Sequence, residues 1–154
     1  MSTPHLAHGK HYKHLAIELL IDGIIMFFVM YAMVDSAQYI YLNNNNLYMT
    51  AMMVAPMGLV MLFMMRSMFP DRRLNLVLYT LLAILFFASW YGIRAQTFVG
   101  NEQFLRAMIP HHSGAVLMCR KASITDPEIK DLCKQIIESQ QREINQMENI
   151  LKRY

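Results

Sequence analysis

The sequence lacks the short motifs that mark several classes of metalloenzyme. His-Glu-x-x-His and Cys-x-x-Cys are both absent, and neither His111 nor His112 has a glutamate three residues before it. Di-iron sites in helical bundles use Glu-x-x-His motifs, so these absences argue against oxidase chemistry and leave a mononuclear His–Glu copper site as the alternative. We therefore predict no catalytic residues and expect that the protein is not an enzyme.

Charged residues are also scarce. They make up 16% of the 154 residues, the formal net charge is only +3, and no basic run lies beside aromatic residues. This composition does not indicate a basic surface that would bind nucleic acid, so nucleic acid is not an expected partner. The chain is instead 55% hydrophobic, which is too apolar for an ordinary soluble domain.

Three apolar segments, at residues 14–34, 48–65 and 74–93, are each long enough to cross a hydrocarbon core of ~30 Å. No small-residue cleavage site follows the first, so it does not fit a signal peptide. The expected organisation is a His-rich tail over residues 1–13, a three-span membrane domain over 14–95 and a small helical outer domain over 96–154.

The distribution of basic residues predicts the orientation of the spans. Lys10 and Lys13 precede the first span, and three arginines lie between the second and third spans, whereas residues 35–47 contain no Lys or Arg. Because basic loops stay in the cytoplasm, the N-terminus is predicted to be cytoplasmic and the outer domain to lie across the membrane. In a bacterium, this means an inner-membrane protein with a periplasmic C-terminal domain.

Histidines recur every third residue near the N-terminus, at His5, His8, His11 and His14. On a helix they would form a drifting imidazole face, and on a flexible tail they would form a weak chelator for Cu(II), Ni(II) or Zn(II). The interpretation that we favour is a disordered basic tail beside the membrane.

The outer domain is predicted to be an antiparallel helical hairpin. Asn101 is expected to cap its first helix, and Thr125-Asp126-Pro127-Glu128 combines capping side chains with a proline near the first helical position of the second. If the chain turns near residues 123–126, residues at equal distances from the turn lie side by side, so that their numbers sum to roughly 252. Cys119 then lies beside Cys133, and His112 beside Gln140.

The first helix of this hairpin carries imidazoles and thioethers on a face that should be apolar. Together these groups suit a soft ion, above all Cu(I). Met108 and Met118 lie roughly 15 Å apart along the helix, so one ion cannot take both. The predicted cluster is therefore Met108, His111, His112 and Met147, supported by Gln140 and Glu143, with Met118 serving a second ion or a neighbouring protomer. The alternative is that Gln140 and Glu143 only satisfy the histidines as hydrogen-bond partners.

Cys119 and Cys133 allow two interpretations. Outside the cytoplasm they could form a disulfide that links the two helices, or remain as inert buried thiols. Alternatively, their reduced thiolates could join Met118 as soft ligands. We favour the disulfide or the buried thiols.

Three patterns in the C-terminal third resemble the bacterial family known as domain of unknown function 305. They are Met108-Ile-Pro-His111-His112-x-x-Ala115-x-x-Met118, then Asp126-Pro127-Glu128, then Gln140-x-x-Glu143-Ile144-x-x-Met147. The match covers about residues 104–151. The resemblance implies a ferritin-like helical bundle with periplasmic relatives implicated in binding copper or silver and in resistance to them.

The resemblance also implies a ligand set and an oligomer. The positions that it carries over as metal ligands are Met108, His111, His112, Met118 and Met147. Larger members of the family contain two His-His hairpins and this chain contains one, so a full four-helix bundle requires a second copy. The expected fold is therefore all-α, with three transmembrane helices followed by half of a ferritin-like bundle that dimerises or forms a higher homo-oligomer. The pair of cysteines is not part of the family pattern.

The second span contains a methionine at every fourth position: Met49, Met53, Met57, Met61 and Met65. These thioethers form one slowly winding stripe, along which Cu(I) could pass by exchange between sulfurs. The Met-x-x-x-Met element is similar to that of eukaryotic copper importers. Methionine is also an adaptable apolar filler, and simple packing is the interpretation that we favour.

The leading hypothesis is a membrane-anchored protein that sequesters or hands on copper, preferentially Cu(I), with Ag(I) as a mimic and other divalent metals as alternatives. Its expected partners are the lipid bilayer, the metal ion and further copies of itself. One alternative is copper transport through a methionine-lined oligomer of the three spans. Another is a structural or partner-binding membrane protein that binds no metal.

Overall fold

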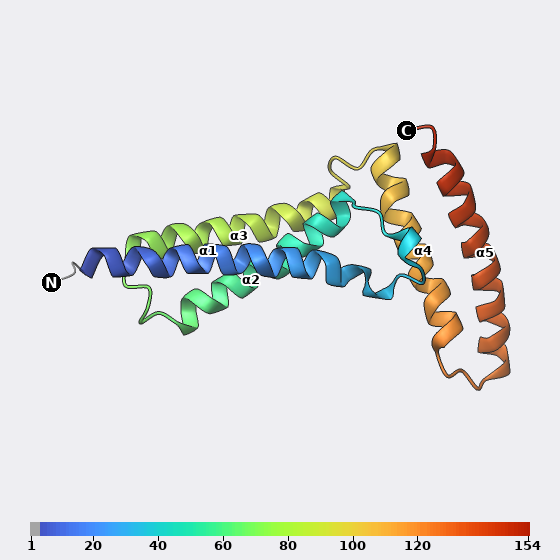
Figure 1. Cartoon of the computed structure of the whole chain (residues 1–154), viewed down its shortest axis with the longest axis horizontal. Coiled ribbons are helices and arrows are strands. Elements are labelled where there is room, and N and C mark those ends of the chain that lie inside the picture. Colours follow the sequence, from blue (N-terminus) through green and yellow to red (C-terminus); the bar gives the residue numbers. More distant parts are fainter. Residues whose placement is uncertain (1–3) are drawn as a thin grey trace. The chain divides into compact units, whose positions relative to one another are not determined.

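The structure, a computed structural model, describes residues 4–154, and all regular structure in that range is helical. The five α-helices and two short 3-10 turns are shown in Figure 1. They are α1 (Pro4–Val29), η1 (Met30–Met33), η2 (Ala37–Tyr39), α2 (Asn44–Met64), α3 (Arg72–Ala95), α4 (Asn101–Lys121) and α5 (Pro127–Leu151). The all-α prediction is confirmed.

Helix α1 begins at Pro4, so the described part of the His-rich segment is helical and not a disordered tail. The polarity of this segment favours disorder, but its residues, including Gly9, continue the helix of the first apolar segment. Residues 1–3 lie outside the described residues, as do the side chains of His5 and His8.

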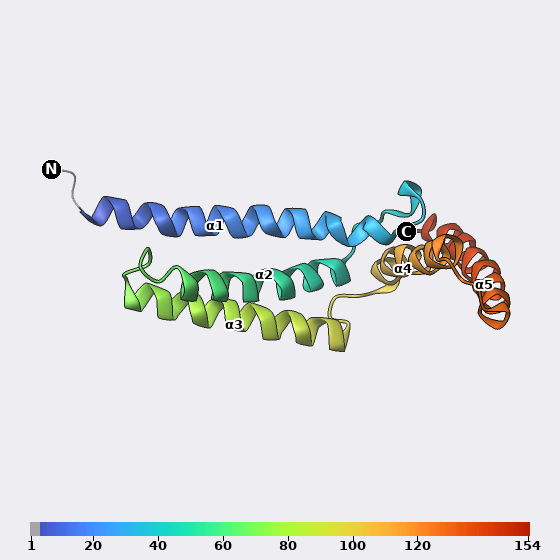
Figure 2. The ribbon, with the colours of Figure 1, turned by 90° about the horizontal axis from the view of Figure 1, so that it is seen from below.

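Helices α1, α2 and α3 form one compact unit, in which α2 lies between the other two (Figure 2). Segments Gly9–Met33, Asn44–Met64 and Arg72–Ala95 are long and apolar enough to cross a membrane, and only 11%, 28% and 11% of their most apolar windows are buried within the protein. Leu15, Leu62 and Phe69 form the small core of this unit. Because most of the apolar surface has no protein cover, a lipid bilayer is the environment that suits these helices.

Helices α4 and α5 form the predicted antiparallel hairpin in the second unit (Figure 1). The Asp126 side chain accepts hydrogen bonds from the backbone N–H groups of Glu128 and Ile129, and Pro127 takes the first helical position. This cap satisfies two donors that a helix start leaves free. Asn101 is not the cap of α4 as predicted, because Gly100 takes the capping position and Asn101 is the first helical residue.

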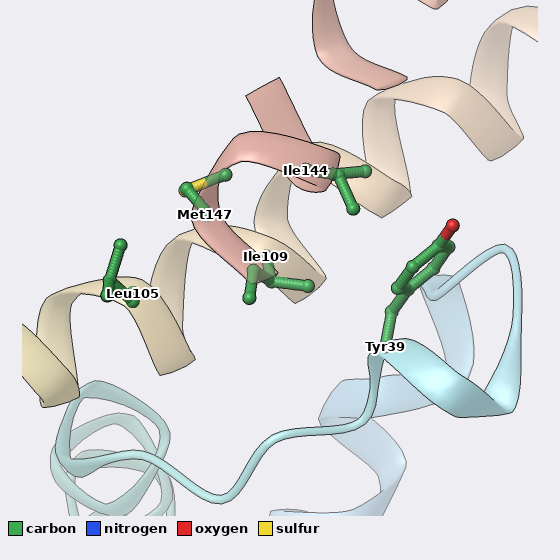
Figure 3. Packing of buried hydrophobic residues seen from close by; sticks show 5 residues of the cluster. All are labelled: Tyr39, Leu105, Ile109, Ile144 and Met147. Carbon is green, nitrogen blue, oxygen red and sulfur yellow. The ribbon is translucent and has the colours of Figure 1, made fainter. Parts of the chain in front are cut away.

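The core of this unit lies between the two helices and is closed by a residue from far away in the sequence. Leu105 and Ile109 of α4 pack against Ile144 and Met147 of α5, and the Tyr39 ring of η2 lies beside them (Figure 3). Ile109 and Ile144 are completely buried. The region between the first two spans thus contributes to the core of the hairpin.

Polar contacts fix the same segment, residues 29–46, to the hairpin. The Asp35 N–H donates to Ser113 Oγ at 2.8 Å, and the Asp35 carboxylate pairs with Arg120. The Tyr39 hydroxyl accepts a hydrogen bond from Gln141 Nε2 at 3.0 Å. We call residues 29–46 the docking loop.

The docking loop changes the expected domain organisation. The predicted boundaries assign it to the membrane domain, whereas Val29–Asn46 and Phe98–Tyr154 form one compact unit. The loop covers one face of the hairpin, and self-association stays a prediction.

Candidate metal site

Both ring nitrogens of His112 have a partner in the structure. The residue is only 9% exposed, on the face of α4 that meets α5. Its Nδ1 lies 3.0 Å from the Met108 carbonyl oxygen, one helical turn earlier. A carbonyl oxygen only accepts hydrogen bonds, so Nδ1 carries a proton and the lone pair of the neutral ring lies on Nε2. In metal sites a backbone carbonyl often fixes a histidine ligand in this way.

The second ring nitrogen of His112, Nε2, faces a carboxylate. His112 Nε2 lies 2.8 Å from Glu143 Oε2, whose side chain is about half exposed. The neutral Nε2 and the carboxylate can be bridged by a proton or by a metal ion. Burial is the main effect on the pKa of His112 and lowers it, the nearby Glu143 carboxylate opposes this, and His111 lowers it further. Because the pKa of His112 is lowered overall, a proton competes less strongly with a metal ion for Nε2.

The contact with Glu143 matches the predicted role of this residue as a partner of the histidines. Gln140, one turn earlier on α5 and half-buried, is not the residue that pairs with His112. The register in which numbers sum to 252 predicts Gln140 at this level. Glu143 takes the contact because its carboxylate is the stronger acceptor and reaches back along the helix by one turn.

The other predicted ligands are not gathered around His112. His111 is exposed on α4, with its ring centroid 5.9 Å from that of His112 and the two ring planes at 77°. Met118 is 57% exposed, so it lies outside the core between α4 and α5. Successive residues turn by about 100° around a helix, and placing His112 toward α5 therefore turns His111 outward.

The two remaining thioethers belong to the apolar core. Met147 is a buried member of the core cluster, and the partly buried Met108 packs against it. Among the described residues, no group of three or more His, Cys, Asp or Glu side chains is arranged to hold a metal ion. Within one chain the site is therefore the pair His112 and Glu143, with Met108 one turn away.

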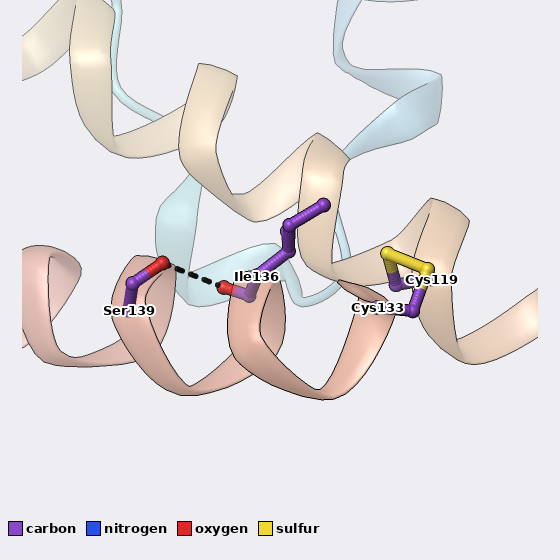
Figure 4. Close-up of a disulfide and its surroundings, with 4 residues drawn as sticks. All are labelled: Cys119, Cys133, Ile136 and Ser139. Carbon is purple, nitrogen blue, oxygen red and sulfur yellow. Dashed lines mark hydrogen bonds between the residues drawn. A yellow bond between two sulfur atoms is a disulfide. The ribbon is translucent and has the colours of Figure 1, made fainter. Parts of the chain in front are cut away.

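Cys119 and Cys133 form a disulfide with their Cα atoms 5.2 Å apart, which lies within the normal range (Figure 4). The two cysteines lie side by side as the hairpin register predicts, and the disulfide is one of the two favoured alternatives. Neither sulfur is then a thiolate ligand for an ion at Met118. The bond links the two helices near the turn of the hairpin.

The methionine stripe of α2 lies only partly among the three helices, where Met61 packs against the small core of that unit. Met49, Met53 and Met65 are among the exposed hydrophobic residues, and Met57 and Met61 are half-buried. Met65 also lies beyond the last residue of α2. A sulfur path would have to form between copies of the chain, so transport stays a prediction that no contact within the unit supports.

The lowered pKa of His112 predicts how the stability of the metal-free hairpin changes with pH. The unfolded chain takes up a proton near the ordinary histidine pKa of about 6.5, whereas the folded chain takes it up only at lower pH. The contribution of neutral His112 is therefore present above about pH 6.5 and is lost as pH falls toward the lowered pKa. Amide hydrogen exchange of α4 and α5 with a metal chelator present, at several pH values, should show protection decreasing over this window.

A His112→Gln variant provides the control for this measurement. It cannot titrate, so its protection should be flatter with pH over the same range. An equal loss of protection in the variant would mean that another group controls the acid sensitivity.

Comparison with known proteins places the hairpin in a family. Residues 93–151 match the family model described as Domain of unknown function (DUF305). The chain is also 38% identical over 114 residues to "Uncharacterized protein L153" of Acanthamoeba polyphaga mimivirus, with 73% of each chain covered. The chain belongs to the DUF305 family. Its DUF305 region includes all of α4 and α5, with His112 and Glu143, and does not include the docking loop.

No solved structure matches this DUF305 chain. The ferritin-like relationship therefore stays a prediction that rests on the hairpin and its expected second copy. The relative named here comes from a virus, so the predicted bacterial origin also stays a prediction.

Proposed function

We propose that this protein is a membrane-anchored copper-binding protein, whose hairpin holds an ion for sequestration or hand-over at the membrane surface. The observation that carries the proposal is the orientation of His112. Its Nδ1–H donates a hydrogen bond to the Met108 carbonyl oxygen, and its Nε2 faces the half-exposed carboxylate of Glu143. A histidine oriented in this way is ready to exchange a proton for a metal ion at one defined nitrogen.

The types of side chain available as ligands near His112 favour copper over harder ions. Met108 and His112 lie one turn apart on α4, so a thioether and an imidazole project from neighbouring positions of one helix. Nitrogen with sulfur suits Cu(I), for which Ag(I) serves as a mimic, whereas nitrogen with the Glu143 carboxylate suits divalent copper or zinc. We take Cu(I) as the preferred ion and Glu143 as the group that supports it.

The proposal includes a location and an assembly. Basic residues before α1 and between α2 and α3 put those segments in the cytoplasm, so the hairpin lies on the other side, which is the periplasm if the cell is bacterial. The disulfide agrees with an oxidising compartment. The functional form is a homodimer or a higher homo-oligomer in the bilayer.

Titration of the full-length protein in detergent tests the site. Ascorbate keeps the copper as Cu(I), and a competing chelator reports the affinity. We expect His112→Ala to weaken binding at least tenfold, about 1.4 kcal/mol, because it removes the oriented nitrogen. Met108→Leu keeps the apolar volume but removes the sulfur, and should weaken Cu(I) binding more than Zn(II) binding.

The matched control is Met118→Leu, which removes an exposed thioether from the same helix and should leave the affinity unchanged. If wild type and His112→Ala bind Cu(I) equally, the ion is not held at this site. Copper that remained bound would then point to the N-terminal histidines or to the α2 methionines. Absence of any metal would favour the structural or partner-binding alternative.

A further inference from the structure

The hairpin carries a second, largely apolar face with several half-exposed large side chains, although Met108 and Ile150 at its edge also pack against the core cluster. On α4 it follows steps of four and three residues, and on α5 it follows the same steps. We call this the open face, and it consists of Phe104, Met108, His111, Ala115 and Met118 of α4 with Ile129, Leu132, Ile136, Ser139, Glu143, Gln146 and Ile150 of α5. Phe104, Met118, Ile129 and Leu132 are each about half exposed, at 51%, 57%, 48% and 52%.

The docking loop occupies the opposite side of the hairpin. Its contacts are made by Ser113 and Arg120 of α4 and by Gln141 of α5. Because successive residues turn by about 100° around a helix, each of these residues lies on a different side of its helix from the open-face residues. The hairpin therefore has one face closed by its own chain and one face still free for another element.

The spacing of the open face is that of helices that pack against further helices. Alternating steps of three and four residues repeat every seven, and such a repeat forms the seam between helices in bundles and coiled coils. A hairpin supplies two of the four helices of a bundle, so a second hairpin completes it.

The polar groups of the open face, a histidine donor and a carboxylate acceptor, complement those of a second copy of this chain. The open face is apolar toward the turn and has His111 and Glu143 near its middle. Their numbers sum to 254, close to the 252 of the disulfide pair, so they lie at almost the same level of the hairpin. A two-fold axis parallel to the helices keeps this level, and therefore sets each His111 opposite the partner's Glu143.

We propose that two copies of this chain pair through their open faces, with α4 of one against α5 of the other. Each His112–Glu143 pair then gains the partner's His111, which supplies the third donor that one chain lacks. The pairing of the faces stands on the exposed residues alone, and the role of His111 as a donor rests on the proposed function. Two imidazoles and a carboxylate form a set that takes copper or zinc.

Cross-linking between differently tagged full-length chains in detergent tests the pairing. One chain carries Ala115→Cys in the α4 stripe and the other carries Ser139→Cys in the α5 stripe, and a short bismaleimide is added with a metal chelator present. We expect a covalent heterodimer. The matched control replaces Ser139→Cys with Glu138→Cys, since Glu138 is exposed but lies about 100° around α5, and should give at least tenfold less product.

A second measurement separates the pairing from the metal. Leu132→Lys puts a charge into the open face and should convert the protein to a monomer by light scattering, with Cu(I) affinity at least tenfold lower. Cross-linking with unchanged affinity in Leu132→Lys would show that one hairpin holds the ion alone, and would overturn the shared donor set. Cross-linking in a protein that binds no metal would overturn the proposed function but support the pairing.

Failure to cross-link would overturn the pairing itself. Equal product from Ser139→Cys and Glu138→Cys would do the same, because it would indicate random encounter. If Ala115→Cys neither cross-links nor reacts with a soluble maleimide, the membrane or another protein covers the open face, and the second copy is the wrong occupant.

Discussion

An Ile144→Ala variant is expected to lose roughly 2–5 kcal/mol of hairpin stability. Ile144 is completely buried between α4, α5 and the docking loop, next to Ile109 and Tyr39 (Figure 3). Truncation removes buried methyl groups and leaves a cavity that three chain segments would have to close. Because the whole stability of a domain is typically about 5–15 kcal/mol, this loss should be visible as faster amide exchange throughout α4 and α5.

Ile129→Ala is the matched control, because it makes the same chemical change on the same helix at a half-exposed position. In the monomeric protein it should cost much less, about 0.5–1 kcal/mol. Similar losses for the two variants would contradict the assignment of the core. A large loss for Ile129→Ala only in the paired form would instead support the open face as an interface.

Removal of the disulfide should have an effect of similar size. The Cys119→Ser, Cys133→Ser double variant opens a link across a sequence separation of 14 residues (Figure 4). In the chain-entropy model, a link of this length stabilises the folded state by about 3 kcal/mol, because it restricts the unfolded chain. Protection of the α4–α5 turn from exchange or proteolysis should fall most.

Reduction of the wild-type protein in its folded state is the control for side effects of the serines. It should reproduce the loss without adding a hydroxyl group to the interface. A double variant as stable as the oxidised wild type would show that the caps and the core alone determine the hairpin.

The elements that local signals specify were predictable from the sequence. Spans are marked by long apolar runs, and the start of α5 by a capping aspartate followed by proline. The register of the hairpin follows from the position of its turn, and it correctly places Cys119 beside Cys133, whereas His112 lies against Glu143 and not Gln140. Each of these features depends on residues close together in the chain.

The docking loop could not be predicted in this way. Tyr39 enters the core against α4 and α5 across two intervening spans, and nothing near it in the sequence indicates a distant partner. An aromatic and polar loop between two spans looks like any connection at a membrane surface. Only the completed packing reveals that the loop belongs with the hairpin.

The orientation of the site was predictable only in part. The α4 sequence has two neighbouring apolar faces. One includes Leu105 and Ile109, and the other includes Phe104 and Met118. Periodicity alone does not decide which of them faces α5, so His111 and His112 were both candidates for the inner position. Burial assigns His112 to the core and leaves His111 outside.

The docking loop also has a consequence for the order in which the protein assembles during synthesis. Tyr39 leaves the ribosome before α4 and α5 are made, so the loop has no partner to pack against until the last helix is complete. For the same reason, a fragment that begins after α3 would lack part of its own core, and any biochemical study of the hairpin should include the loop.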